Sequence, residues 1–225
     1  PAGNKTVNYY HLGNGLQSGE TGQDPLDGSL IGKVYKQELY SNSSQLVSQT
    51  YADWGTQDLG SDRDFVYQSR VVADENGKQT AKEFSYDLTN GNLISEINYG
   101  KVNSSANNFT DVGIDKQTTT YSYTTSGPNL VATAERTEQF GARISQQKFY
   151  YDGQMLGTAV KGNVTKVESW INGTTYVNTQ KSYNALGLVL SETDPRGNTT
   201  TYSYDTYNLY PAFITNPLAQ QTAFL

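Results

Sequence analysis

Residues 193–203 read TDPRGNTTTYS, and the pattern returns in weaker form at residues 215–225 as TNPLAQQTAFL. Self-similarity with a period of about 20 residues is typical of architectures in which each unit packs its apolar face against its neighbours. The first copy continues into Tyr204-Asp205, whereas the sequence stops inside the second copy. We therefore expect stacked units, in a chain that is truncated inside a repeat.

The repeat has a short core that reads aromatic-x-Tyr-Asp. It occurs in full at residues 84–87, 149–152 and 202–205, with Thr for Asp at residues 121–124, and with Asn after the tyrosine at residues 182–184. Alternate residues of a strand point to one face, so the two rings share that face. The Asp, Asn or Thr that follows accepts hydrogen bonds from downstream amides and ends the strand in a turn. The pattern predicts a unit of strand, tight turn and strand.

These residues resemble the YD repeats of bacterial Rhs proteins and of the B component of insecticidal Tc toxin complexes. The segment from Tyr183 to Asp205 is close to the consensus of that family. Residues 9–15, 19–20, 32–35 and 38–40 resemble the stretch that precedes the repeats in Tc B components and SpvB-like proteins. We therefore divide the chain into a β-rich region at residues 1–80 and YD-repeat hairpins at residues 81–225.

The resemblance implies an all-β fold, in which antiparallel hairpins form a strand ribbon that is part of a larger hollow shell around a toxic C-terminal domain. It implies a virulence role for a bacterial chain that is secreted or displayed at the cell surface. The implied partners are the remainder of the same polypeptide and a Tc C-type or other toxin-bearing shell component. The residues expected to carry the structural repeat are Tyr86, Asp87, Tyr123, Tyr151, Asp152, Tyr183, Asp194, Pro195, Gly197, Tyr204 and Asp205.

Composition favours strands and excludes several classes of protein. The 225 residues include 18 Tyr and 21 Gly, and Tyr prefers pleated surfaces while Gly marks turns. A net charge of −6 argues against nucleic acid, which requires a basic footprint. The sequence has no cysteine for a disulfide or a thiolate metal site. No apolar run approaches the roughly 18 residues of a membrane span.

Local turn signals refine the prediction. The pairs Asn76-Gly77, Asn90-Gly91 and Asn172-Gly173 each suit a two-residue type I′ hairpin. Residues 194–197 suit a type I or type II turn with proline at its second position. Residues 130–140 are the best helical candidate, but their threonines make them a poor one.

Candidates for chemistry are few. His11 is the single histidine, without a nearby acid or nucleophile in a familiar pattern. The glycines Gly13, Gly15 and Gly19 are spaced one residue too widely for a dinucleotide loop. Calcium could be held by Asp58, Asp62 and Asp64 or by Asp111 and Asp115, although neither set matches a known calcium loop. The repeat aspartates recur once per unit, which favours a structural role. We expect no enzymatic activity and no cofactor.

Three functions remain open. The first is a structural segment of a toxin-encapsulating shell. The second is an adhesion module that binds glycans through exposed aromatic side chains, Trp54 and Trp170 among them. The third is a calcium-stabilised extracellular β-domain. The shell hypothesis predicts that Tyr86, Tyr151 and Tyr204 are largely buried, and that Tyr204→Ala destabilises more than the loop change Asn107→Ala. An exposed edge at residues 223–225 could pair with a second chain.

Overall fold

The computed structural model describes residues 4–11, 28–60 and 63–224. The chain divides into two compact units, Pro1–Thr119 with Glu138–Ala142, and Thr120–Thr137 with Arg143–Leu225. The boundary at residue 80 was drawn where the YD-repeat pattern begins in the sequence, and it stays a prediction.

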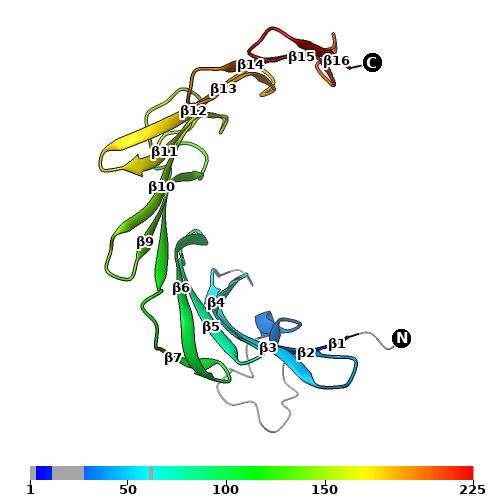
Figure 1. Cartoon of the computed structure of the whole chain (residues 1–225), viewed down its shortest axis with the longest axis vertical. Coiled ribbons are helices and arrows are strands. Elements are labelled where there is room, and N and C mark those ends of the chain that lie inside the picture. The colour runs from blue at the N-terminus through cyan, green and yellow to red at the C-terminus, as the bar shows by residue number, and fades with distance from the viewer. Residues whose placement is uncertain (1–3, 12–27, 61–62, 225) are drawn as a thin grey trace. The chain divides into compact units, whose positions relative to one another are not determined.

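The first unit is a meander in which each strand from β1 to β6 pairs antiparallel with the next one along the chain, and β7 pairs back onto β6 (Figure 1). The strands are β1 (Lys5–Tyr10), β2 (Val34–Tyr40), β3 (Leu46–Asp58), β4 (Asp64–Glu75), β5 (Lys78–Asp87), β6 (Asn92–Ser105) and β7 (Asn108–Asp111). A short 3₁₀ helix, η1 (Gly28–Leu30), precedes β2.

The second unit repeats this plan, and each strand from β9 to β16 pairs with the next. The strands that lie wholly or mostly in this unit are β8 (Gln117–Tyr123), β9 (Val131–Glu138), β10 (Arg143–Tyr151), β11 (Val164–Asn172), β12 (Thr175–Tyr183), β13 (Val189–Thr193), β14 (Thr199–Tyr204), β15 (Pro211–Thr215) and β16 (Gln221–Ala223). Residues 130–140 thus supply β9 and no helix, as their β-branched threonines favour. The expectation of an all-β antiparallel fold is confirmed.

Few side chains are fully buried. In the first unit Val72, Ala81 and Val102 pack together, and the rings of Tyr99 and Phe109 lie against them. Those two rings meet edge to face, with centroids 4.7 Å apart. Most other side chains of the described strands are half-buried or exposed. Pairs of side chains on neighbouring strands therefore contribute much of the lateral packing.

The three Asn-Gly pairs do not all form the predicted type I′ turn. Asn76 and Gly77 both have positive φ, at 51° and 82°, and join β4 to β5, so the predicted type I′ hairpin is confirmed. Asn90-Gly91 was predicted to form the same turn, and this is wrong. A longer loop joins Asp87 to Asn92, and only Gly91 of the pair has positive φ.

The prediction for Asn172-Gly173 is also wrong. Asn172 remains in β11 and pairs with Thr175, so the turn is shifted by one residue to Gly173-Thr174. The turn at residues 194–197 is of type I, since Gly197 N donates to Asp194 O at 3.0 Å and Arg196 has no positive φ.

The weaker copy of the repeat makes the same turn. Ala219 N donates to Asn216 O at 2.9 Å, as Gly197 N does to Asp194 O. Ala219 takes a φ of 62° where Gly197 has 86°. The sequence repeat is therefore also a repeat of backbone structure.

Candidate functional site

Four of the repeat tyrosines, Tyr86, Tyr151, Tyr183 and Tyr204, lie at a slip in the pairing with the following strand. At Tyr86 the following strand carries an extra residue, Ile94, between the partners of Ser85 and Tyr86. The same slip inserts Thr165, Leu190 and Ala212 opposite Tyr151, Tyr183 and Tyr204, respectively. One extra residue on one strand is a β-bulge, which bends the strand and increases its twist. The tyrosine motif thus coincides with a recurring bulge.

In the second unit the hydroxyls of these tyrosines form hydrogen bonds with the preceding strand, on the side away from the bulge. Each one donates to the carbonyl oxygen of the first residue of the preceding strand: Tyr151 to Val131 (2.7 Å), Tyr183 to Val164 (2.7 Å) and Tyr204 to Val189 (2.8 Å). Burial raises the pKa of Tyr151 and of Tyr183. Each tyrosine therefore ties together its own strand, the strand before and the strand after.

Tyr86 is held by aromatic neighbours in the first unit. Its ring centroid lies 5.8 Å from that of Phe65 and 5.2 Å from that of Tyr67. Burial raises its pKa. Tyr123 ends β8 half-buried, and the hydroxyl of the following Thr124 accepts from Leu130 N at 3.0 Å. The tyrosines thus share a place in the strand but not all their contacts.

The three tyrosines that were predicted to be largely buried, Tyr86, Tyr151 and Tyr204, differ in exposure. Tyr151 is 6% exposed, whereas Tyr86 and Tyr204 are half-buried. Neighbouring strands cover only part of a ring in a sheet where most side chains remain partly accessible. Truncation of Tyr151 should therefore cost more than truncation of Tyr204.

The acidic or amide residue after each tyrosine accepts hydrogen bonds from turn amides. Asp87 Oδ1 accepts from Thr89 N at 2.9 Å, and Asp205 Oδ1 accepts from Leu209 N at 2.7 Å. Asn184, in the same position, accepts from the amides of Leu186 and Leu188. Hydrogen bonds from the Thr89 side chain and amide lower the pKa of Asp87. These residues close turns.

Asp194 also closes a turn, the one between β13 and β14, which lies at the other end of the strands. Its Oδ1 accepts from Arg196 N at 2.8 Å and from Asn198 N at 2.9 Å. Pro195 occupies the second position of that turn, where its fixed φ suits type I geometry. Gly197 supplies the positive φ that follows it.

Asp152 is the most heavily bonded of the repeat aspartates. Its carboxylate accepts from four backbone amides, those of residues 160–163, at 2.8–3.0 Å. Burial raises the pKa of this carboxyl, but the four amide donors outweigh burial and lower the pKa to about 2. Asp152 thereby closes the loop between β10 and β11.

The loop between β10 and β11 is hydrogen-bonded to the loop between β8 and β9. Ala159 N donates to Ser126 O at 3.0 Å and Thr125 N donates to Gly157 O at 2.8 Å. The contact depends on Gly127, because a Cβ atom there would lie 1.8 Å from the Ala159 carbonyl oxygen. Hydrogen bonds therefore hold these two loops together.

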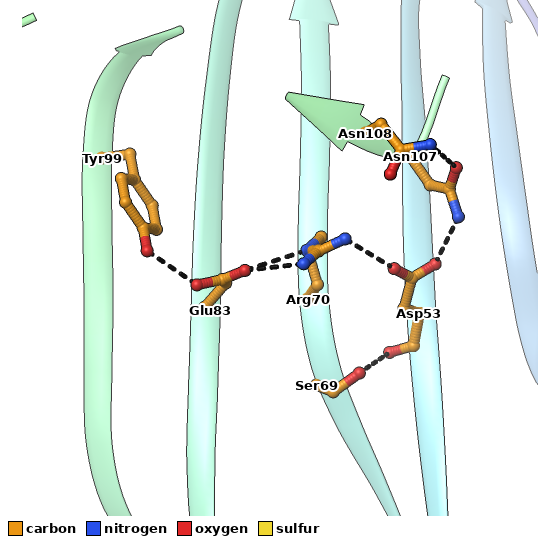
Figure 2. Close-up of polar contacts among 7 residues, drawn as sticks. All are labelled: Asp53, Ser69, Arg70, Glu83, Tyr99, Asn107 and Asn108. Carbon is orange, nitrogen blue, oxygen red and sulfur yellow. Dashed lines mark hydrogen bonds and ion pairs between the residues drawn. The ribbon is translucent and has the colours of Figure 1, made fainter. Parts of the chain in front are cut away.

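A polar network that the sequence does not signal crosses β3 to β6 of the first unit. Arg70 donates to Glu83 Oε1 at 2.8 Å and lies 3.5 Å from Asp53 Oδ2, as Figure 2 shows. Tyr99 donates to the second oxygen of Glu83 at 2.7 Å, and Asn107 donates to Asp53 at 3.0 Å. Burial, followed by the bond to Glu83, raises the pKa of Tyr99 to about 12.

Glu38 is the centre of a second network on β1 and β2. It is 6% exposed, and it accepts from the hydroxyls of Tyr9 and Tyr40, both at 2.7 Å. Lys36 lies 2.6 Å from Glu38, with its ammonium group 5.0 Å from the centre of the Tyr9 ring. Lys36 is the main reason that the pKa of Glu38 falls to about 2; the tyrosines add to it, and burial opposes it.

The same grouping of tyrosine, glutamate and lysine recurs in the second unit. Glu168 accepts from Tyr150 at 2.9 Å and from Lys166 at 2.8 Å, and Lys166 lies over the Tyr150 ring at 3.8 Å. On the same face, Arg143 lies over the ring of Trp170 at 5.6 Å. These charges are paired with each other and with aromatic rings, which suits lateral packing.

Some of the residues considered for chemistry lie in the described part of the chain. His11 packs edge-on against Tyr35, with centroids 5.3 Å apart. No three His, Asp or Glu side chains within the described ranges gather as a metal site. Gly13, Gly15, Gly19 and Asp62 lie outside the described residues. In the part of the chain that the structure describes, no helix is long and apolar enough to cross a bilayer.

Comparison with known proteins supports the repeat and the fold. The family model for the RHS Repeat matches residues 183–220. The crystal structures of TcdB2-TccC3-Cdc42 and TcdB2-TccC3 have TM-scores of 0.52 and 0.51, each with 11% sequence identity over 88% of this chain. This chain spans 16% of the length of either of those chains. No curated protein sequence matches.

The matched repeat contains Tyr183, Asp194 and Tyr204 with the contacts described above. At 11% identity, the likeness to TcdB2-TccC3 shows the fold alone. The chain thus contains an RHS repeat at residues 183–220, and its fold is like that of part of TcdB2-TccC3.

Proposed function

We propose that this chain is a structural segment of a YD-repeat shell that encloses a toxic C-terminal domain and helps to deliver it. The observation that carries the proposal is the recurrence of one unit. In three hairpins a tyrosine at a bulge ties the preceding strand through its hydroxyl, and an Asp or Asn closes the turn that follows. A sheet built in this way is extended unit by unit, each unit contacting its neighbours.

The partners follow from the same proposal. They are the remainder of the polypeptide and a toxin-bearing component of the C type, as TcdB2 stands with TccC3 in the similar structures. A secreted or cell-surface location accompanies this role. A function without catalysis is supported by the use of Asp87, Asp152 and Glu38, whose carboxylates are occupied by turn amides or by tyrosine and lysine side chains.

Protease protection of the toxic domain tests the proposal. The polypeptide, as encoded in its reading frame, is produced with its toxin-bearing component and treated with trypsin. The proposal predicts that the toxic domain resists cleavage in the assembly and is cleaved when it is alone. Equal cleavage rates in both states would contradict enclosure.

A pair of variants makes this test specific. Replacing Tyr151, Tyr183 and Tyr204 together by Ala should abolish protection, since the ribbon loses three ties between strands. Tyr207→Ala, at a position that is 79% exposed, should leave protection intact.

Glycan adhesion through the tryptophans has less support. Trp170 donates its indole N–H to Gly173 O at 3.0 Å, and Arg143 covers the ring. Trp54 donates to Val34 O at 2.9 Å, and Lys33 lies 5.3 Å from its ring centre. Binding on a glycan array that Trp54→Ala or Trp170→Ala abolishes would reverse this ranking.

A further inference from the structure

One residue has a double role at each join between hairpins in the second unit. Val164 pairs with Tyr151 across the bulge, and its carbonyl oxygen accepts from the hydroxyl of Tyr183. Val189 stands in the same relation to Tyr183 and Tyr204. The joins thus form a series in which the partner of one tyrosine is the acceptor for the next.

Val34 has both roles in the first unit, far from any Tyr-Asp motif. It is the first residue of β2, and it pairs with Tyr10 across a slip that follows Tyr9. Its carbonyl oxygen accepts from the indole Nε1–H of Trp54 at 2.9 Å. Trp54 therefore stands where the series places a repeat tyrosine.

The strand register supports this equivalence in the first unit. Lys36 pairs with Tyr51, which places Asp53 opposite Val34 and Trp54 one residue beyond. The pairing of β3 with the following strand slips between Asp53 and Trp54.

The register around Tyr183 is the same. Lys166 pairs with Gln180, which places Ser182 opposite Val164 and Tyr183 one residue beyond. The pairing with the following strand slips between Ser182 and Tyr183. Register, slip and hydrogen bond thus agree at Trp54 and at Tyr183.

We propose that Trp54 is a positioning residue equivalent to a repeat tyrosine, and that residues 34–54 form a repeat unit without the Tyr-Asp motif. The indole N–H can only donate, and here it ties the start of β2 to β3 as the tyrosine hydroxyls tie their strands. Gly55 follows Trp54 because the ring of Tyr67 occupies the space of a Cβ, at 2.4 Å. The inference concerns the repeat itself and does not depend on enclosure of a toxin.

Hydrogen exchange measured by NMR tests the proposal on the whole chain. The two tryptophans give two indole N–H signals, and Trp170→Phe assigns them. Trp170 bonds within an exposed hairpin end, whereas Trp54 bonds between paired strands. The Trp54 indole proton should exchange at least about tenfold more slowly. Exchange as fast as that of Trp170 would overturn the proposal.

A matched pair of variants supplies the second readout. Trp54→Phe should speed amide exchange at the junction of β1 and β2, where His11 N donates to Lys33 O. Tyr183→Phe should do the same at the junction of β10 and β11, where Asp152 N donates to Asn163 O. Tyr183→Phe should lower Tm by about 2–4 °C, the effect of one lost hydrogen bond in a chain of this size. Trp54→Phe should lower Tm by at least as much, because it also removes part of the aromatic ring. An effect of Tyr183→Phe without a local effect of Trp54→Phe would refute the equivalence.

Discussion

The hydroxyl of Tyr183 lies 2.7 Å from the carbonyl oxygen of Val164 and donates a hydrogen bond across the open end of the β11–β12 hairpin. The backbone of the same tyrosine pairs with Val189 at a bulge in the next hairpin. The side chain and the backbone of one residue thus link the end of one hairpin to the start of the next. This explains why the aromatic ring is followed directly by a turn-forming residue, here Asn184.

Tyr183→Phe should lower Tm by about 2–4 °C, because it removes a hydrogen bond worth about 1 kcal/mol and leaves the Val164 carbonyl without that donor. Thermal unfolding monitored by circular dichroism measures the shift. Tyr207→Phe is the control, since its ring is 79% exposed. Equal Tm values for the two variants would show that the hydroxyl contact does not stabilise the ribbon.

Asp152→Asn should destabilise the chain at neutral pH and lose its effect in acid. The pKa of the carboxyl is about 2 in the folded chain, below its ordinary 3.8, so ionised Asp152 stabilises the fold above about pH 4. That contribution, on the order of 1 kcal/mol after solvent screening, is lost as the pH falls through about 2. Urea unfolding of the unaltered chain and of Asp152→Asn, from pH 7 to pH 2, measures the gap between their free energies of unfolding. A gap that stays constant would contradict the role of the carboxylate.

Gly127→Ala should unfasten the loop between β10 and β11. The added methyl would lie 1.8 Å from the Ala159 carbonyl oxygen, at a φ of 81° that already disfavours alanine. Gly141→Ala is a matched control, because its φ is 84° and its surroundings are open. Both variants share a backbone cost of about 1–2 kcal/mol. Gly127→Ala, unlike Gly141→Ala, should also speed amide exchange at Ala159. Unchanged exchange at Ala159 would show that the loop can shift to make room for the methyl group.

Arg70→Ala should cost about 1–3 kcal/mol, because it leaves the half-buried carboxylates of Asp53 and Glu83 without their shared cation. Lys82→Ala removes a more exposed ion pair, with Glu96, and should cost about 0.2–1 kcal/mol. Urea unfolding compares the two. A smaller loss for Arg70→Ala than for Lys82→Ala would rule out the network of Figure 2 as a stabilising element.

Much of the fold follows from local sequence signals. Alternating aromatic residues and recurrent turn residues predict the antiparallel hairpins, and the short-range Asx bonds of Asp87 and Asp205 follow from residue type. The Asn90-Gly91 and Asn172-Gly173 turns are mispredicted because the register of the flanking strands decides which residues are central.

The long-range contacts are not accessible from sequence alone. The Arg70 network joins residues that only the strand register brings together. Asn107 looks like an inert loop residue, yet it donates to Asp53 at 3.0 Å, so Tyr207 is the better control position. Trp54 carries no repeat motif, and its place in the series depends on the register of three strands.

The most direct test of the central claim, that aromatic donors tie successive strands into one ribbon, is deuterium uptake of the chain and of its triple variant Tyr151→Phe, Tyr183→Phe, Tyr204→Phe. Deuterium uptake of the triple variant should be faster only at the amides around Val131, Val164 and Val189, and unchanged around Val72. Identical uptake in the two proteins at all of these sites would contradict the claim.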